Sequence, residues 1–311
     1  MLGKTAGGLY WMFRYLERGE NTARLVDAGL HIALTHAQSE DDQWDSLLET
    51  TEARRQFEAS GRIADRQNVL EFLLSDRSNP SSVLSCFHAA RTNARLVRTA
   101  ITREVWESVN ETWLTLNEAL SRPIIVSELP DLLALIRRQN SLVRGALHGT
   151  MLRNDTYDFC RLGSAVERAD NTSRILDVKY YVLLPTAIPV GSPFDNVQWE
   201  SVLRSVSGQR AYRWLHGTDV SASGIADFLI FDTRMPRSLM FSLRETTDLL
   251  ASLETAYAMT VESHAMAKRQ MDVLDGQSVK QVIETGLHEF LQSFRQDNAS
   301  RAVQIEQDFR F

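Results

Sequence analysis

The chain has 311 residues, of which 7 are proline and 15 are glycine, roughly 2% and 5% against averages of about 5% and 7%. Sandwiches, barrels and propellers need those residues at their many turns, so these folds are excluded and an all-α fold is predicted. The formal net charge of −6 lacks the basic excess that binding to a phosphate backbone requires, so we expect no nucleic-acid partner.

Apolar residues at helical spacing predict a series of helices. The first runs from about Leu9 to Ala37 and is apolar around its whole circumference, which places it inside a bundle. In the fourth, Asn79 is predicted as the N-cap and Pro80 as the first helical residue. The second half has a wide non-helical stretch from Pro185 to Pro193, and its last helix opens after Gly276. Further helices are predicted from near Asp42, over Val69 to Leu74, over Arg103 to Leu120 and over Leu129 to Gly149.

An internal repeat organises the chain. Residues 16–27 (LERGENTARLVD) match residues 166–177 (VERADNTSRILD) at six of twelve positions. Two further blocks recur in the same order, QWDSLL at 43–48 with QWESVL at 198–203, and VLEFLLSDRSNPSS at 69–82 with IADFLIFDTRMPRS at 225–238. These collinear matches predict a tandem-duplicated helical bundle, with two pseudo-symmetric halves, residues 1–150 and 151–311, packed together in one globular unit.

The first repeated block carries adjacent charges, Glu17 with Arg18 and Glu167 with Arg168, on helix faces that also bear apolar residues. Charges on such faces must find partners inside the protein. If the halves pack about a pseudo-twofold axis, the Glu of each repeat meets the Arg of the other, and the four residues form a structural clamp. The functional alternative is a pocket in which these four residues, as catalytic candidates, bind an anionic group or move a proton.

Other polar positions recur in the same block. A carboxylate followed four residues later by Arg is a common surface pair on helices, and the block contains two of them. Asp170 has a shorter side chain than the Glu at the matching position, so full equivalence of the two halves is not expected. The candidates for a structural or ligand-binding role are Glu20, Asn21, Arg24, Asp170, Asn171 and Arg174.

The third repeated block contains Asp76 with Ser82, and Asp232 with Ser238. We expect each carboxylate to lie beside the N-terminus of the following helix, where unpaired backbone N–H groups and the helix dipole favour a negative charge. A phosphate or carboxylate ligand could use the same helix starts. A binding role therefore stays open beside the capping role.

Sequence patterns for other chemistries are missing. The histidines are scattered, and no zinc, P-loop, dinucleotide-binding or serine-hydrolase motif occurs, so no metal and no cofactor are expected. Two cysteines, Cys86 and Cys160, are too few for a disulfide framework and suit a reducing cytoplasm, with Cys86 as an inert core thiol. Because no run approaches about 18 consecutive apolar residues and no signal peptide is recognised at the N-terminus, we expect a cytoplasmic protein without a membrane span.

The chain contains the segments YWMFRYLERGENTARLVD, NPSSVLSCFHAARTNARLVR, REVWESVN, SAVERADNTSRILDVKYYVLLP and PRSLMFSL. Together they resemble the alpha-E family of bacterial all-helical proteins, which is named for a conserved Glu-Arg motif. The resemblance implies that Glu17, Arg18, Glu167 and Arg168 are the signature residues of a duplicated motif. It also implies partners, because gene neighbourhood links the family to circularly permuted ATP-grasp ligases, transglutaminase-like proteins and an N-terminal-nucleophile peptidase.

Two functions follow from this resemblance to a peptide synthesis or modification system. In the first, the protein is a non-catalytic partner or scaffold that docks on an ATP-grasp ligase and positions a peptide. In the second, it is an enzyme that acts on amide or acyl groups of a peptide, with the paired Glu-Arg motifs in a pocket. The residues favour the first, because no nucleophile and base occur at a recognisable spacing.

Overall fold

The computed structural model describes residues 3–33, 40–183, 193–218 and 220–311. In these ranges the chain forms fifteen α-helices, one 3₁₀ helix and no strand, so the predicted all-α class is confirmed. The first half contains α1 (Lys4–Ala33), α2 (Glu40–Thr50), α3 (Arg54–Ala59), α4 (Arg66–Leu74), α5 (Val83–Leu96), α6 (Arg103–Ala119), η1 (Val126–Glu128) and α7 (Leu129–Thr150). The second half contains α8 (Asp155–Leu183), α9 (Pro193–Ser205), α10 (Gln209–His216), α11 (Ala222–Phe231), α12 (Leu239–Tyr257), α13 (Glu262–Asp275), α14 (Val279–Thr285) and α15 (Leu287–Phe309).

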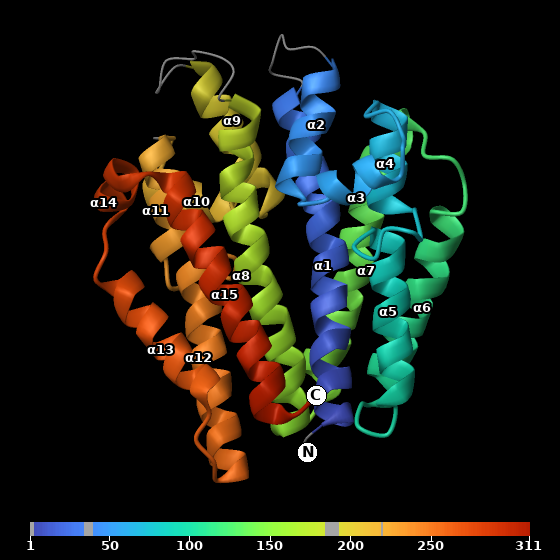
Figure 1. The fold of residues 1–311 in the computed structure, drawn as a ribbon, viewed down its shortest axis with the longest axis vertical. Coiled ribbons are helices and arrows are strands. Elements are labelled where there is room, and N and C mark those ends of the chain that lie inside the picture. Colours follow the sequence, from blue (N-terminus) through green and yellow to red (C-terminus); the bar gives the residue numbers. More distant parts are fainter. Residues whose placement is uncertain (1–2, 34–39, 184–192, 219) are drawn as a thin grey trace.

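Helices α1 and α8 form the centre of the bundle and run side by side (Figure 1). The other helices of the first half lie mainly to the right of this pair in the figure, and those of the second half mainly to the left. The two central backbones are so close that a Cβ atom added to Gly163 in α8 would lie 2.2 Å from the carbonyl oxygen of Tyr10 in α1. Only glycine fits there. This close approach brings the side chains of the two Glu-Arg motifs within reach of each other.

The hydrophobic core continues across both halves. Helix α2 packs on α8 as well as on α1, and α9 packs on α1 as well as on α8. The buried apolar side chains form one cluster that includes Leu9 in α1, Phe87 in α5, Phe159 in α8 and Leu243 in α12. Burial of this apolar surface is the main driving force for assembling the bundle. The two central helices are therefore covered by helices from both halves.

The start of α5 differs from the prediction. Ser82 is its N-cap, and the Ser82 hydroxyl accepts a hydrogen bond from the backbone N–H of Ser85 at 3.1 Å. The predicted start at Asn79 and Pro80 is wrong, because Asn79 belongs to the preceding turn. Its side-chain amide donates to the carbonyl oxygen of Phe72 at 2.9 Å.

Other helix boundaries also differ. Helix α1 begins at Lys4, earlier than predicted, and residues 34–37 of the predicted first helix lie outside the described residues, as do residues 185–192 of the predicted non-helical stretch. The predicted single last helix is two helices, α14 and α15, because Gly286 between them has a φ of +110°, which interrupts helical geometry. No helix in the described ranges combines the length and the apolar composition that crossing a membrane requires.

Candidate functional site

The two Glu-Arg motifs face each other between α1 and α8. The Glu17 carboxylate accepts hydrogen bonds from Nε and Nη2 of Arg168 at 3.1 and 3.0 Å. The Glu167 carboxylate accepts hydrogen bonds from Nε and Nη2 of Arg18 at 2.5 and 3.0 Å. Both pairs are bidentate, the strong geometry for a guanidinium and a carboxylate. The reciprocal ion pairs that the clamp requires are therefore present.

The first motif lies at the centre of a group that we call the buried cluster. It consists of Glu17, Glu20, Arg24, Arg144, Arg168 and Arg237. Arg237 comes from the turn before α12 and reaches both carboxylates, with Nη1 3.2 Å from Glu17 and Nη2 donating to Glu20 at 2.8 Å. Glu20 also accepts hydrogen bonds from Arg144 and Asn140 of α7. Side chains from α7, from α8 and from the turn before α12 thus meet at the buried carboxylates of Glu17 and Glu20.

The guanidiniums of the buried cluster keep its carboxylates ionised. Burial by itself raises the pKa of Glu17, but attraction to Arg168 and Arg237 outweighs burial and lowers the pKa to about 2. Burial likewise raises the pKa of Glu20, and the same kind of attraction, led by Arg237, brings it below its ordinary range. A general acid at neutral pH needs a pKa near 7. The buried cluster therefore has the geometry of a clamp and lacks the electrostatics of an acid catalyst.

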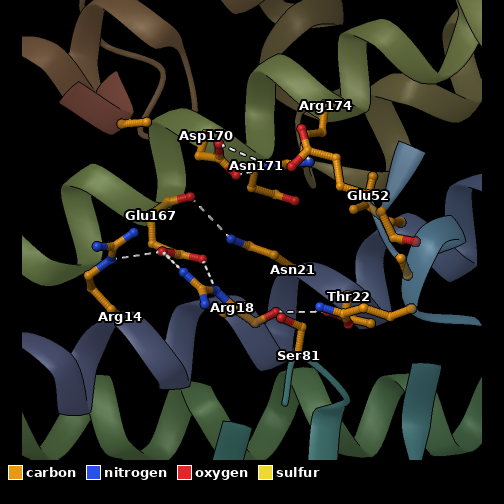
Figure 2. A pocket seen from close by; sticks show the side chains of 15 residues that line it. Arg14, Arg18, Asn21, Thr22, Glu52, Ser81, Glu167, Asp170, Asn171 and Arg174 are labelled. Atoms are coloured by element: carbon orange, nitrogen blue, oxygen red, sulfur yellow. Dashed lines mark hydrogen bonds and ion pairs between the residues drawn. The ribbon is translucent and has the colours of Figure 1, made fainter. Parts of the chain in front are cut away.

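The second motif lines a cavity (Figure 2). The charged residues that α1 and α8 contribute to this cavity, which we call the pocket cluster, are Arg14, Arg18, Glu167, Asp170 and Arg174. The cavity has a volume of about 350 Å³, at the small end of the roughly 300–1,000 Å³ typical of ligand pockets. Helices α1 and α8 supply most of its wall. The loop after α2, with Glu52, the turn before α5, with Ser81, and single residues of α3 and α15 also line it. Of the two Glu-Arg pairs, Arg18 with Glu167 lines this cavity.

The carboxylates of the pocket cluster have fewer partners than those of the buried cluster. Glu167 accepts a hydrogen bond from Arg14 at 3.0 Å in addition to those from Arg18. Within the described part of the chain, the Asp170 carboxylate accepts hydrogen bonds from Arg174 alone, at 2.6 and 3.1 Å. The Asp170 side chain is 24% exposed, against 0% for Glu20 at the matching motif position. Burial raises the pKa of Asp170, but attraction to Arg174 lowers it below its ordinary value. The cavity thus contains an ionised carboxylate with spare acceptor capacity.

Two asparagines in the cavity wall also have unused hydrogen-bonding capacity. Asn171 is 1% exposed, and neither its side-chain oxygen nor its nitrogen has a partner among the described residues. Asn21 donates to the backbone oxygen of Glu167 at 3.4 Å, whereas its own side-chain oxygen has no such partner. An unpaired buried polar group costs roughly 1–3 kcal/mol. Asn171 reaches from α8 into the cavity (Figure 2), where a ligand would complete these bonds.

The interpretation of Glu20 and Arg24 as a surface pair is wrong. The two side chains do form an ion pair at 2.7 Å, but both are buried. The reason is tertiary, because the end of α9 and the chain after it lie against Arg24, whose guanidinium donates to the backbone oxygen of Ser205 and to the Ser207 hydroxyl. The matching pair of Asp170 and Arg174, at 2.6 Å, is closer to the surface.

The third repeated block spans most of α4 and α11 and the turns that lead from them into α5 and α12. Ser82 and Ser238 are the N-caps of these helices. The Asp76 and Asp232 carboxylates instead accept hydrogen bonds from backbone N–H groups two residues further along the chain, each at 2.7 Å. The carboxylates thus hold the turn that leads into each helix, and the serine hydroxyl accepts the capping hydrogen bond. The backbone oxygen of Asp232 also accepts a hydrogen bond from the N-cap Ser238 at 2.6 Å.

Sequence reasoning missed several charged partners that contact the motifs from outside the first repeated block. They are Arg14, Glu52, Arg144 and Arg237. A signal for one of them was present, because Arg237 stands opposite Ser81 in the third repeated block. A charge on one side of a repeat and a small residue on the other indicates a place where the two halves differ.

Both cysteines are free and buried, and the expected core position of Cys86 is confirmed. Burial raises the pKa of the Cys86 thiol to about 12 and also raises that of Cys160. A nucleophilic cysteine needs a lowered pKa. Neither thiol has the environment of a nucleophile.

Comparison with known proteins covers nearly the whole chain. A family model described as a predicted alpha-helical domain with a conserved ER motif matches residues 1–309. Two relatives, uncharacterized proteins of Mycobacterium bovis and Mycobacterium tuberculosis, are each 22% identical to this chain over 256 residues. The matches cover 76% of this chain and 28% of each relative, so the chain spans less than a third of the length of these relatives. No solved structure matches the chain.

Proposed function

The chain belongs to the Alpha-E family, and on this premise we propose that it is a non-catalytic partner in peptide synthesis or modification, which holds a peptide for an ATP-grasp ligase. The family resemblance supplies the ligase as the partner. The cavity between α1 and α8 supplies the place for the peptide.

The observation that carries this proposal is the buried Asn171 amide in the cavity wall, whose oxygen and nitrogen have no partner among the described residues. A peptide bond offers one N–H donor and one carbonyl acceptor, and a side-chain amide can bind both at once. The free side-chain oxygen of Asn21 adds a second acceptor on the facing helix. A peptide in the cavity would therefore satisfy groups that the folded chain leaves unpaired.

The electrostatics of the motifs favour binding over catalysis. Attraction to arginines lowers the pKa of Glu167 against the raising effect of burial, so this carboxylate is ionised at neutral pH. It accepts hydrogen bonds from Arg14 and Arg18, which occupy its oxygens. The alternative, an enzyme acting on amide or acyl groups, would have to take its attacking group from a substrate or from the partner.

The test uses an ATP-grasp ligase of the kind that gene neighbourhood links to the family, with ATP turnover and product mass as the measurements. We expect product to fall at least roughly tenfold, equivalent to about 1.4 kcal/mol, when the protein is omitted or replaced by Asn171→Leu. Asn93→Leu makes the same substitution in α5, outside the cavity wall, and should behave as the wild type. Both variants should still co-purify with the ligase.

Two results would contradict the proposal. One is unchanged product in the absence of the protein, and the other is failure of the wild type to co-purify with the ligase. Product formed from peptide and ATP by this protein alone would establish the enzyme alternative instead.

A further inference from the structure

The buried cluster and the pocket cluster occupy corresponding places in the two halves of the chain. The N-caps of α5 and α12 show which residue of one half matches which residue of the other. Ser82 caps α5 and Ser238 caps α12. The residue before each cap lies against the Glu-Arg motif of the other half. On one side that residue is Arg237, which contacts the first motif. On the other side it is Ser81, which lines the cavity of the second motif.

A second pair of matched residues supports the same correspondence between the two halves. Glu52 and Ser207 follow α2 and α9, and both have a positive φ, of 52° and 58°. Glu52 lies 2.9 Å from Arg174, and the Ser207 hydroxyl accepts a hydrogen bond from Arg24 at 3.1 Å. The surroundings of the two motifs thus correspond in backbone as well as in side-chain contacts.

Arg237 shows what a guanidinium does at its position. Its Nη2 donates to Glu20 at 2.8 Å and its Nη1 lies 3.2 Å from Glu17, so one planar group bridges two carboxylates. On the other side, the matching carboxylates are Glu167 and Asp170, and the serine at position 81 is too short to bridge them. The cavity lies between these three residues.

We propose that the pocket binds the guanidinium group of a ligand in the place that corresponds to the Arg237 guanidinium of the buried cluster. This inference rests on the proposed function, since it names the group of the peptide that the pocket receives. A guanidinium has five N–H donors in one plane. The acceptors facing it are the Asp170 carboxylate and the free side-chain oxygens of Asn21 and Asn171.

The charges around the cavity permit this added cation. The wall contains three guanidiniums and three carboxylates, namely Arg14, Arg18, Arg174, Glu52, Glu167 and Asp170. A ligand guanidinium would raise the count to four cations against three carboxylates. The buried cluster already holds four guanidiniums against two carboxylates, and of these six side chains only that of Arg144 is more than a tenth exposed. With one bound cation, the pocket would therefore hold a smaller excess of positive charge than the buried cluster already holds, and at a more open site.

Isothermal titration of the full chain tests the guanidinium preference. The ligands are a blocked Ala-Arg-Ala peptide, the same peptide with citrulline as a neutral isostere of arginine, free arginine and ethylguanidinium. We expect the arginine peptide to bind at least roughly tenfold more tightly than the citrulline peptide, a difference of about 1.4 kcal/mol. Free arginine that binds as tightly as the peptide would identify a free metabolite, rather than a peptide, as the source of the guanidinium.

Variants locate the binding in the pocket. Ser81→Arg places the chain's own guanidinium where the ligand would bind, and should weaken binding of the arginine peptide at least tenfold. Asp170→Asn should also weaken binding of the arginine peptide, because it removes the charge of the accepting carboxylate. Ser121→Arg introduces the same side chain at an exposed site beyond α6 and should leave binding unchanged.

Equal affinity for arginine and citrulline peptides, or full affinity in Ser81→Arg, would overturn this inference. The proposed function has a separate test in the ligase assay. If Asn171→Leu abolishes product while the citrulline peptide binds as well as the arginine peptide, the guanidinium assignment fails and the proposed function stands. If the arginine peptide binds in the pocket but ligase output does not depend on the protein, the guanidinium assignment stands and the proposed function fails.

Discussion

The buried cluster and the pocket cluster are built on matching motif positions, yet they differ in how many cations surround the carboxylates. Glu20 accepts hydrogen bonds from Arg24, Arg144 and Arg237. Asp170 at the matching position accepts them from Arg174 alone within the described residues. One site is sealed by side chains of the protein, and the other opens into a cavity of about 350 Å³. A repeated pair of ion pairs can thus serve as a clamp on one side and as the wall of a pocket on the other.

The difference follows from single residues outside the motif. Ser81 stands where Arg237 seals the buried cluster, and among the described residues no arginine contacts Asp170 in the way that Arg144 of α7 contacts Glu20. Removing one partner of a buried ion pair leaves an uncompensated charge, whereas water can replace a lost partner at an open site. The two clusters should therefore respond differently to the same substitution.

The largest expected effect is that of Glu17→Gln. This change leaves Arg168 buried without its carboxylate and removes one of the two carboxylates that Arg237 contacts, and we expect a loss of about 3–5 kcal/mol in the free energy of unfolding. Urea unfolding followed by circular dichroism measures it. If the variant has nearly the same free energy of unfolding as the wild type, the ion pair of Glu17 and Arg168 is not a structural clamp.

The matched control is Glu167→Gln, the same substitution at the corresponding position of the pocket cluster. Its partners Arg18 and Arg14 are 29% and 12% exposed, so water can solvate the Arg18 guanidinium when it loses its carboxylate, and Arg14 only in part. We expect a smaller loss, of about 1–3 kcal/mol. Equal losses in the two variants would mean that the open cavity does not relieve the unpaired charge.

The next effect is a loss of stability in acid. The folded pKa of Glu17 is about 2 against an ordinary 4.5, so the ionised form is favoured by folding. The resulting stabilisation is present in full above about pH 4.5 and is lost as the pH falls toward 2. It amounts to about 3 kcal/mol, at 1.36 kcal/mol per pKa unit. The measurement is the free energy of unfolding between pH 6 and 2.5, and Glu17→Gln should show a shallower decline than the wild type. Identical pH profiles would exclude Glu17 as a main contributor.

Much of the fold could be predicted from the sequence because helical periodicity and the scarcity of glycine and proline are local signals. The pairing of Glu17 with Arg168 was also within reach, since the repeat implies reciprocal contacts. The depth at which the motif is buried could not be predicted, because Glu20 and Arg24 are covered by α7, by the end of α9 and by the turn before α12. Whether a motif lines a cavity depends on the residues that face it from distant segments, such as Ser81, and spacing within the motif carries no information about them.

The smallest expected effect on stability is that of Ser81→Arg. The new guanidinium would enter an existing cavity beside Glu167 and Asp170, which already have arginine partners, so the free energy of unfolding should stay within about 1 kcal/mol of the wild type. The reciprocal change, Arg237→Ser, opens the buried cluster and should cost about 3–5 kcal/mol. Thermal and urea unfolding of both variants measure the contrast. A loss above 2 kcal/mol in Ser81→Arg would mean that the space is not free for a guanidinium. A near-neutral Ser81→Arg beside a costly Arg237→Ser means that the fold requires this cation on one side and only tolerates it on the other, which is the condition under which a ligand can supply it.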